Sequence, residues 1–105
     1  MYPQYVTIKA YLRVLKTGIS YKKTPSIGKV LVPIKYRSMG YGRIIMIKAI
    51  EYIYTTIDVT SITISFQEYL LDFYTSLGFV KASDPYLEDD IPHIKMIHTK
   101  SMICF

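Results

Sequence analysis

The stretch RSMGYG, residues Arg37–Gly42, separates an apolar run, Ile27–Ile34, from a segment with helical spacing, Ile44–Tyr54. The apolar run predicts a buried strand, and the spacing after the stretch predicts a helix. A glycine-containing turn that opens a helix presents unpaired backbone N–H groups at the positive end of the helix dipole. Such a turn suits a phosphate or pyrophosphate, so the interpretation of the whole chain depends on whether it binds an anion.

Spacing alone leaves two interpretations of this turn open. Gly40 and Gly42 also suit an ordinary tight connection, and the flanking arginines also favour solubility. The Gly-Lys-Ser/Thr ending of a Walker loop is missing, and Ile45 follows where a dinucleotide fingerprint needs its third glycine. On their own, the residues therefore support an anion site and a purely structural turn about equally.

Length and composition are those of a small domain with a core. The chain has 105 residues, half of them hydrophobic, so we expect one domain, residues 1–105. The formal net charge of +5 favours an anionic partner, and nucleic acid, a phosphorylated cofactor and an anionic membrane all qualify. A nucleic-acid-binding domain is the least favoured function, because no Lys/Arg block, aromatic RNA-binding signature or recognition-helix pattern is present.

Cysteine usage and hydropathy point to the cytoplasm. Cys104 is the lone cysteine, which excludes an intrachain disulfide and fits a reducing compartment. His98 and Cys104 fit no metal-ligand spacing, so we expect no metal site. No apolar run approaches about 20 residues, so we expect no transmembrane helix, no signal peptide and no membrane partner.

Two strands are predicted before the turn. Apolar and polar residues alternate over Val6–Leu15, which predicts a strand with one face on the core. A short polar connection leads to Ile27–Ile34, so the two strands should form an antiparallel hairpin with an elaborated loop. Pro33 cannot donate a ladder hydrogen bond and should mark where its strand ends or leaves its neighbour. A strand that diverges beside a glycine-containing turn would leave a cleft for a ligand.

The helix after the turn has one broad apolar face, formed by Met46, Ala49, Ile50 and Ile53. Ile44 and Ile47 interrupt its polar side, which predicts that the helix is covered on more than one face.

The rest of the chain predicts a strand at Ser61–Ser65 and a helix at Gln67–Leu77 that Gly78 ends. A closing hairpin from Phe79 to Thr99 should follow, with an acidic tip at Glu88–Asp90. The predicted order is strand, strand, helix, strand, helix, strand, strand. Antiparallel strands around one strand–helix–strand crossover indicate an α+β fold.

Three motifs follow one another along the chain. The first is Val30–Pro33, a short spacer, and the pattern Arg37-x-x-Gly40-x-Gly42 at the start of a helix. The second is FYTSLGF at Phe73–Phe79, and the third is YLEDDIPHI at Tyr86–Ile94 with Met96 after it. Together they resemble the GNAT superfamily of N-acetyltransferases, and the third motif resembles its ElaA-like subfamily. The resemblance covers Val6–Thr99.

This resemblance implies the GNAT fold, a mixed, mainly antiparallel sheet flanked by helices. ElaA-like domains are longer than this chain, and Val6–Leu15 resembles their third strand. Their first strand, the two helices after it and their second strand would precede Met1. We therefore expect a single GNAT-type domain that is N-terminally truncated, without the helices that normally line the acceptor-substrate side.

The resemblance also implies that acetyl-CoA is the acyl donor. The strand end would pair with the pantetheine arm, as an added strand pairs with a sheet edge. The turn would hold the pyrophosphate, with glycines where the phosphates come too close for a Cβ atom. The cofactor-binding residues implied in this way are Val30, Leu31, Val32, Arg37, Ser38, Met39, Gly40, Tyr41, Gly42, Arg43 and Gln67.

Tyr74 aligns with the family's general acid, which protonates the leaving thiolate. Gln67 stands where many members have an asparagine that contacts the cofactor. From the residues alone, Tyr74 is a core tyrosine on the apolar face of its helix, and Gln67 is a polar residue at the N-terminus of that helix.

The general base is left open. Many members carry a glutamate where this chain has Ile62, which cannot take a proton. Glu88, Asp89, Asp90 and His93 remain as candidates, and His is the side chain that titrates closest to neutral pH. The alternatives are a structural hydrogen bond for His93 and a solvated turn for the acidic residues. A water chain, or a base in the missing N-terminal part, would also serve.

The resemblance favours an N-acetyltransferase that moves acetyl from acetyl-CoA to a primary amine of an unidentified acceptor. The alternative is a truncated relative that binds CoA with weak catalysis or none. With the preceding strands missing, Val6–Leu15 would expose a sheet edge, which predicts homo-oligomers or poor solubility.

Overall fold

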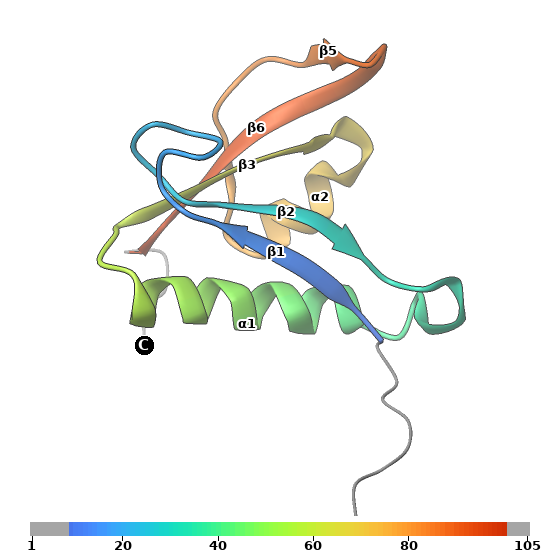
Figure 1. Ribbon diagram of the computed structural model, residues 1–105. Coiled ribbons are helices and arrows are strands. Elements are labelled where there is room, and N and C mark those ends of the chain that lie inside the picture. Colours follow the sequence, from blue (N-terminus) through green and yellow to red (C-terminus); the bar gives the residue numbers. More distant parts are fainter. Residues whose placement is uncertain (1–8, 101–105) are drawn as a thin grey trace, which may run out of the picture.

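The computed structural model describes residues 9–100, in which strands and helices are mixed along the chain (Figure 1). In chain order the elements are β1 (Tyr11–Leu15), β2 (Ser26–Leu31), η1 (Ile34–Tyr36), α1 (Tyr41–Thr56), β3 (Ser61–Gln67), η2 (Glu68–Leu70), α2 (Leu71–Ser76), β4 (Val80–Lys81), β5 (Tyr86–Glu88) and β6 (Ile91–Thr99), where η marks a 3-10 helix. The predicted α+β class is confirmed, and the first arm of the predicted closing hairpin is divided into β4 and β5.

The strands form two sheets. β1 and β2 pair antiparallel as the predicted hairpin. In the second sheet, β6 pairs along one edge with β3, and along the other edge with β4 and β5. All of these pairs are antiparallel, and the longest ladder joins β3 and β6, between which η2, α2, β4 and β5 lie in the chain.

The two sheets meet at one point and then separate. The Thr63 N–H donates to the Pro25 carbonyl at 3.1 Å, and the Thr24 and Thr63 hydroxyls lie 2.7 Å apart. Beyond this point β2 and β3 share no ladder pairing within residues 9–100, and the two strands diverge toward their C-terminal ends (Figure 1). β2 ends two residues before Pro33, so Pro33 marks the end of the strand as predicted, whereas the divergence from β3 begins earlier, near the start of β2.

Both helices cover the same face of the second sheet. α1 reaches it through Tyr54, which contacts His98, and α2 reaches it through Tyr74, which packs on Phe66. The predicted apolar face of α1 is buried, with Met46 and Ile53 fully enclosed. The predicted second cover is wrong, because Ile44 and Ile47 remain 48% and 41% exposed. Within residues 9–100, α1 has a neighbouring layer on one side.

Some predicted boundaries are also wrong. Ile34 belongs to η1 and is exposed, because Pro33 before it cannot continue the ladder. Gln67 was expected to open a helix, yet it ends β3, where it pairs with His93. The helix α2 is accordingly short and begins at Leu71. The predicted strand from Val6 starts at Tyr11 in the described part of the chain, and residues 6–8 lie outside that part.

Two turns agree with the sequence. Gly78 ends α2 with φ +97°, a conformation in the left-handed region that glycine adopts without strain. Asp89 and Asp90 connect β5 to β6 with φ of +51° and +62°, as in a type I′ hairpin turn. Among residues 9–100, no helix is long and apolar enough to cross a membrane.

Candidate functional site

A cleft of about 380 Å³ lies between β2 and β3 where the two strands diverge. Val30 lines it from β2, and successive residues of β3 line it from the other side. Neighbouring side chains of a strand point to opposite faces, so Ile64 and Phe66 reach the cleft from the helix-covered face and Ser65 and Gln67 from the other. The β2–β3 cleft therefore connects the two faces of the molecule.

Tyr74 places a phenol in this cleft. Its side chain is 6% exposed, and its ring packs against Phe66, Phe73 and Phe79 with centroid distances of 4.2, 5.0 and 6.0 Å. Burial, with a smaller contribution from Tyr69, raises the pKa of Tyr74, so the phenol keeps its proton at neutral pH.

The Tyr74 hydroxyl makes no hydrogen bond to another residue among 9–100, and Tyr74 lines the β2–β3 cleft. A buried, neutral and unshared O–H is the arrangement that a proton donor to a ligand requires.

A second hollow, of about 350 Å³, lies over the turn at residues 37–42. We name it the glycine-turn hollow. Val32 and Phe73 line it, and their near neighbours Val30 and Tyr74 line the β2–β3 cleft. The two spaces are therefore lined by neighbouring residues of the segments 30–32 and 73–74.

The N-terminus of α1 opens into this hollow. Gly40 caps the helix with φ +83°, and no side chain caps the first turn. The N–H groups of Tyr41, Gly42 and Arg43 have no acceptor within the helix, and the first turn carries no acidic residue. This end of α1 thus offers unpaired donors and a positive dipole end to an anion.

The two glycines of the turn have different reasons to be glycine. Gly40 has a positive φ, which disfavours any other residue. A Cβ atom on Gly42 would meet only the Phe73 and Val32 side chains at 3.8 Å, which is ordinary contact. Packing in this protein does not require glycine at 42, although glycine is a poor helix former. A ligand that passes close to the Gly42 backbone would explain it.

The two arginines border the glycine-turn hollow. Arg37 Nε donates to the Val32 carbonyl at 3.0 Å. Arg43 donates to the Ser76 hydroxyl at 2.8 Å, and its guanidinium lies 5.6 Å from the Phe73 ring centroid. Both side chains are exposed, and each is held against the wall of the hollow by one hydrogen bond.

Most of the predicted cofactor-binding residues line one of the two spaces. Val30 and Gln67 line the β2–β3 cleft. The glycine-turn hollow is lined by Val32, Arg37, Ser38, Gly40, Tyr41, Gly42 and Arg43. Leu31 and Met39 line neither space and are more than half exposed. They could contribute backbone groups only.

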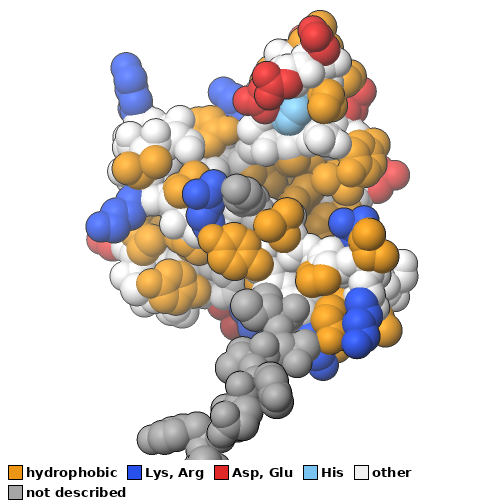
Figure 2. Space-filling model, turned by 45° about the vertical axis from the view of Figure 1, so that its right-hand side comes forward, with side chains coloured by type: hydrophobic (Ala, Val, Ile, Leu, Met, Phe, Trp, Pro, Cys, Tyr) orange, Lys and Arg blue, Asp and Glu red, His pale blue; other side chains and the backbone are white. Residues whose placement is uncertain are grey.

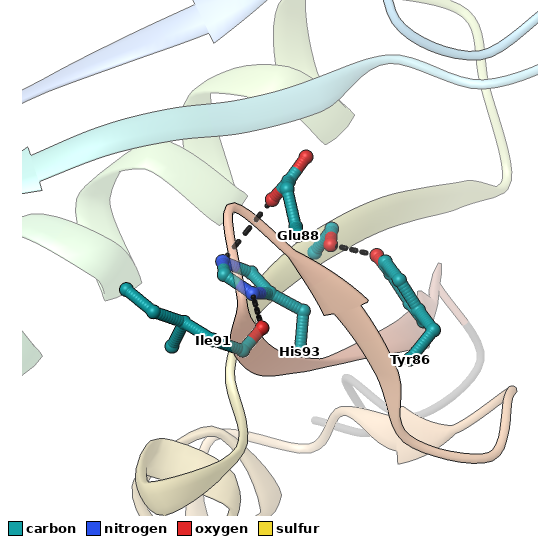
Figure 3. Close-up of polar contacts among 5 residues, drawn as sticks. Tyr86, Glu88, Ile91 and His93 are labelled. Carbon is teal, nitrogen blue, oxygen red and sulfur yellow. Dashed lines mark hydrogen bonds and ion pairs between the residues drawn. The ribbon is translucent and has the colours of Figure 1, made fainter.

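The hairpin of β5 and β6 carries the candidate bases (Figure 3). His93 lines the β2–β3 cleft, its Nδ1–H donates to the Ile91 carbonyl at 2.8 Å, and its Nε2 lies 3.1 Å from Glu88 Oε2. Asp89 and Asp90 form the exposed turn and line neither space. Ile62 is fully buried in the core, as its apolar side chain requires. Of the four candidates, His93 lines the cleft, and Glu88 contacts His93.

Figure 2 shows this arrangement on the surface. A group of acidic side chains lies at the top of the view, above a hollowed region in which hydrophobic side chains are visible at depth. Sequence reasoning missed Ser65 of β3, whose hydroxyl is hydrogen-bonded across β6 to the Tyr86 hydroxyl of β5. The alternation of Ile64, Ser65 and Phe66 was the available signal, because it places Ser65 on the polar face of its strand.

Comparisons with known proteins agree with the geometry. Residues 8–100 match the model of the acetyltransferase (GNAT) domain family. A UPF0039 protein of Schizosaccharomyces pombe is 42% identical over 76 residues, which are 71% of this chain and 51% of the relative. Protein ElaA of Escherichia coli is 33% identical over 87 residues, which are 83% of this chain and 56% of ElaA.

A solved structure gives the same result for the fold. The crystal structure of an acyl-CoA N-acyltransferase from Pseudomonas aeruginosa has a TM-score of 0.77 and 34% identity, covering 86% of this chain and 60% of that one. The chain thus spans little more than half the length of the relatives it matches.

Proposed function

The chain belongs to the GNAT acetyltransferase family, and on that premise we propose that it transfers an acetyl group from acetyl-CoA to a primary amine. The observation that carries the proposal is the pair of neighbouring spaces, the glycine-turn hollow at the α1 N-terminus and the β2–β3 cleft that Tyr74 lines. The first offers backbone donors to an anion, and the second offers a neutral phenol to a leaving thiolate.

Acetyl-CoA would supply the thioester, and the residues of this chain would hold it along the two spaces. The N–H groups of Tyr41, Gly42 and Arg43 would bind the pyrophosphate, with the Arg37 and Arg43 guanidinium groups adding charge beside it. The backbone of Val30–Val32 lies on the divergent side of β2, where its polar groups would pair with the pantetheine amides. Gln67 would contact the same arm from β3.

The transfer step assigns one task to Tyr74. The amine nitrogen attacks the thioester carbonyl carbon, a C–N bond forms and the C–S bond breaks. The leaving thiolate takes the proton of the Tyr74 hydroxyl, and the nitrogen gives up a proton to a base. His93 is the candidate base that lines the cleft, and Glu88 lies beside it. Most of the rate enhancement in such a step comes from positioning.

A second candidate function is CoA binding with weak catalysis or none. Ile62 favours it, because this fully buried apolar residue stands where many family members carry a glutamate base. A domain that binds the donor without a strong base would bind CoA and turn over slowly.

Two measurements test the proposal. Calorimetry with CoA should show binding at ligand concentrations below about 1 mM, and a thiol-release assay with acetyl-CoA and a panel of amines should show amine-dependent release. Binding without amine-dependent release would favour the second function. No binding at millimolar CoA would overturn both.

A further inference from the structure

A third hollow, of about 370 Å³, lies between the β1–β2 connection and β5. We name it the Glu88 hollow. Ser65, Tyr86 and Glu88 line it from the face of the second sheet opposite α1 and α2. Tyr21 lines it from the β1–β2 connection.

The Glu88 hollow opens into the β2–β3 cleft. Ile27 and Gly28 of β2 line both spaces, and so does Ser65 of β3. These residues flank the gap through which the cleft crosses the sheet. A molecule in the Glu88 hollow can therefore reach the thioester position beside Tyr74 from the side opposite the glycine-turn hollow.

The lining of the Glu88 hollow suits a cation. Most of its polar groups are hydroxyls, from Ser20, Tyr21, Ser26, Ser65 and Tyr86. Glu88 is the one residue among those lining it that is charged at neutral pH, in a chain whose net charge is +5. Burial and the nearby Tyr86 raise the pKa of Tyr21, so its hydroxyl stays neutral. The Tyr21 ring already attracts one cation, since Lys95 Nζ lies 5.9 Å from its centroid.

The position of Glu88 indicates which charge it would bind. Glu88 lines this hollow but not the cleft, whereas His93, its partner at 3.1 Å, lines the cleft. The reacting nitrogen must sit in the cleft beside Tyr74. A charge held by Glu88 is then a different group, farther along the acceptor.

We propose that the Glu88 hollow binds the distal positive charge of the acceptor, so that the acceptor is a small amine with a second cationic group. This inference rests on the proposed function for its reacting end. The hydrogen bond between the Tyr86 and Ser65 hydroxyls joins two of the lining residues, and the contact with His93 holds Glu88 (Figure 3). An acceptor with a carboxylate at the distal position would be repelled.

Direct binding tests the hollow without turnover. Putrescine, a diamine, is titrated into the isotope-labelled protein in the presence of CoA and followed by NMR, with n-butylamine and γ-aminobutyrate as comparisons. Putrescine should bind about tenfold more tightly than n-butylamine, and γ-aminobutyrate more weakly than either. Glu88→Gln should remove the preference for putrescine. Asp90→Asn, which neutralises an exposed carboxylate two residues along the same hairpin, is the matched control and should keep it.

Turnover separates this inference from the proposed function. In the thiol-release assay, Glu88→Gln should raise the KM for putrescine about tenfold more than it raises the KM for n-butylamine, whatever its effect on kcat. Equal losses for all amines, or no preference for putrescine in the wild type, would overturn the inference. Preferential putrescine binding in a protein that fails to bind CoA would instead retain the cation site and reject the acetyltransferase.

Discussion

The ring of Tyr74 packs in the core against Phe66, and Tyr74 also lines the β2–β3 cleft. Under the proposed function, Tyr74→Phe should lower kcat by about 100-fold or more, because the thiolate loses its proton donor. CoA affinity and thermal stability should change little, because Phe keeps the packing against Phe66 and Phe79. Thiol-release kinetics and calorimetry measure the two effects.

Tyr52→Phe is the control for this variant, since Tyr52 is an exposed tyrosine of α1 that lines neither the β2–β3 cleft nor the glycine-turn hollow. It should behave as the wild type. Parallel losses of CoA affinity and turnover in Tyr74→Phe would identify Tyr74 as a core residue whose hydroxyl serves the fold.

His98 gives the fold a dependence on pH. Its side chain is 2% exposed, and its Nδ1 lies 2.9 Å from the Tyr54 hydroxyl, whose pKa burial raises to about 12. Burial lowers the pKa of His98 in the folded state. Above the unfolded-state pKa of about 6.5 neither state takes the proton, so stability is constant there. Below it the unfolded chain takes the proton more readily, and the free energy of unfolding falls as the pH drops.

Denaturant unfolding at pH 8, 7, 6 and 5 measures this effect. The slope should reach at most about 1.4 kcal/mol per pH unit for this one proton, and it should level off below the folded-state pKa. His98→Gln cannot titrate and should show a smaller slope over the same range. A slope that is unchanged in His98→Gln would assign the acid sensitivity to other groups.

Sequence periodicity could predict which side chains of α1 are buried, because helical spacing determines which face meets the sheet. Periodicity could not predict that Tyr21, Ser65 and Tyr86 line the same hollow. These residues belong to a loop and two strands far apart in the chain, and the register between β3, β5 and β6 brings them together.

At the scale of elements, substitutions at the N-terminus of α1 can distinguish a glycine that the fold requires from one that a ligand requires. Gly42→Ala should leave the protein equally stable or up to about 1 kcal/mol more stable, because a Cβ atom has room there and alanine favours the helix. The same Cβ atom should lower CoA affinity about tenfold by keeping the pyrophosphate from the backbone. Thermal unfolding and calorimetry with CoA give the two values.

Gly40→Ala provides the contrast. Its φ of +83° should make the alanine variant about 1 kcal/mol less stable, although a Cβ atom would meet nothing within 4 Å.

Wild-type CoA affinity in Gly42→Ala would mean that no ligand approaches the backbone at residue 42, and Gly42 would then have no explanation in the fold.

The elements that sequence reasoning predicted best are those whose signals are local. Gly78 ends α2 because a positive φ follows the last helical turn, and the acidic turn of the closing hairpin needs no distant contact. The predicted start of the helix at Gln67 was wrong, because pairing with a distant strand determines the conformation of this residue. Gln67 completes the β3–β6 ladder opposite His93, and this pairing overrides helical spacing.

At the scale of the whole molecule, a single residue predicted where β2 ends. Pro33 cannot donate a ladder hydrogen bond, and β2 ends two residues before it. The two sheets separate beyond the contact between Thr24 and Thr63, and the cleft follows from that separation. The path of the cleft through the sheet was not foreseeable. It depends on which residues of β2 lie opposite those of β3, and only the folded chain determines this, because the two strands share no ladder pairing within residues 9–100.

The outer edge of β1 is the last feature of the whole molecule that predicts a behaviour. Within residues 9–100, β1 pairs with β2 alone, so its other edge has no strand partner. Unpaired edges pair with further strands unless charge discourages them, and Tyr11 on this edge is 44% exposed. We expect a homo-oligomer, seen by light scattering as a mass above the 12.2 kDa of one chain. Tyr11→Lys should shift it toward the monomer, whereas Tyr52→Lys on α1 should not. A monodisperse wild-type monomer would contradict this pairing.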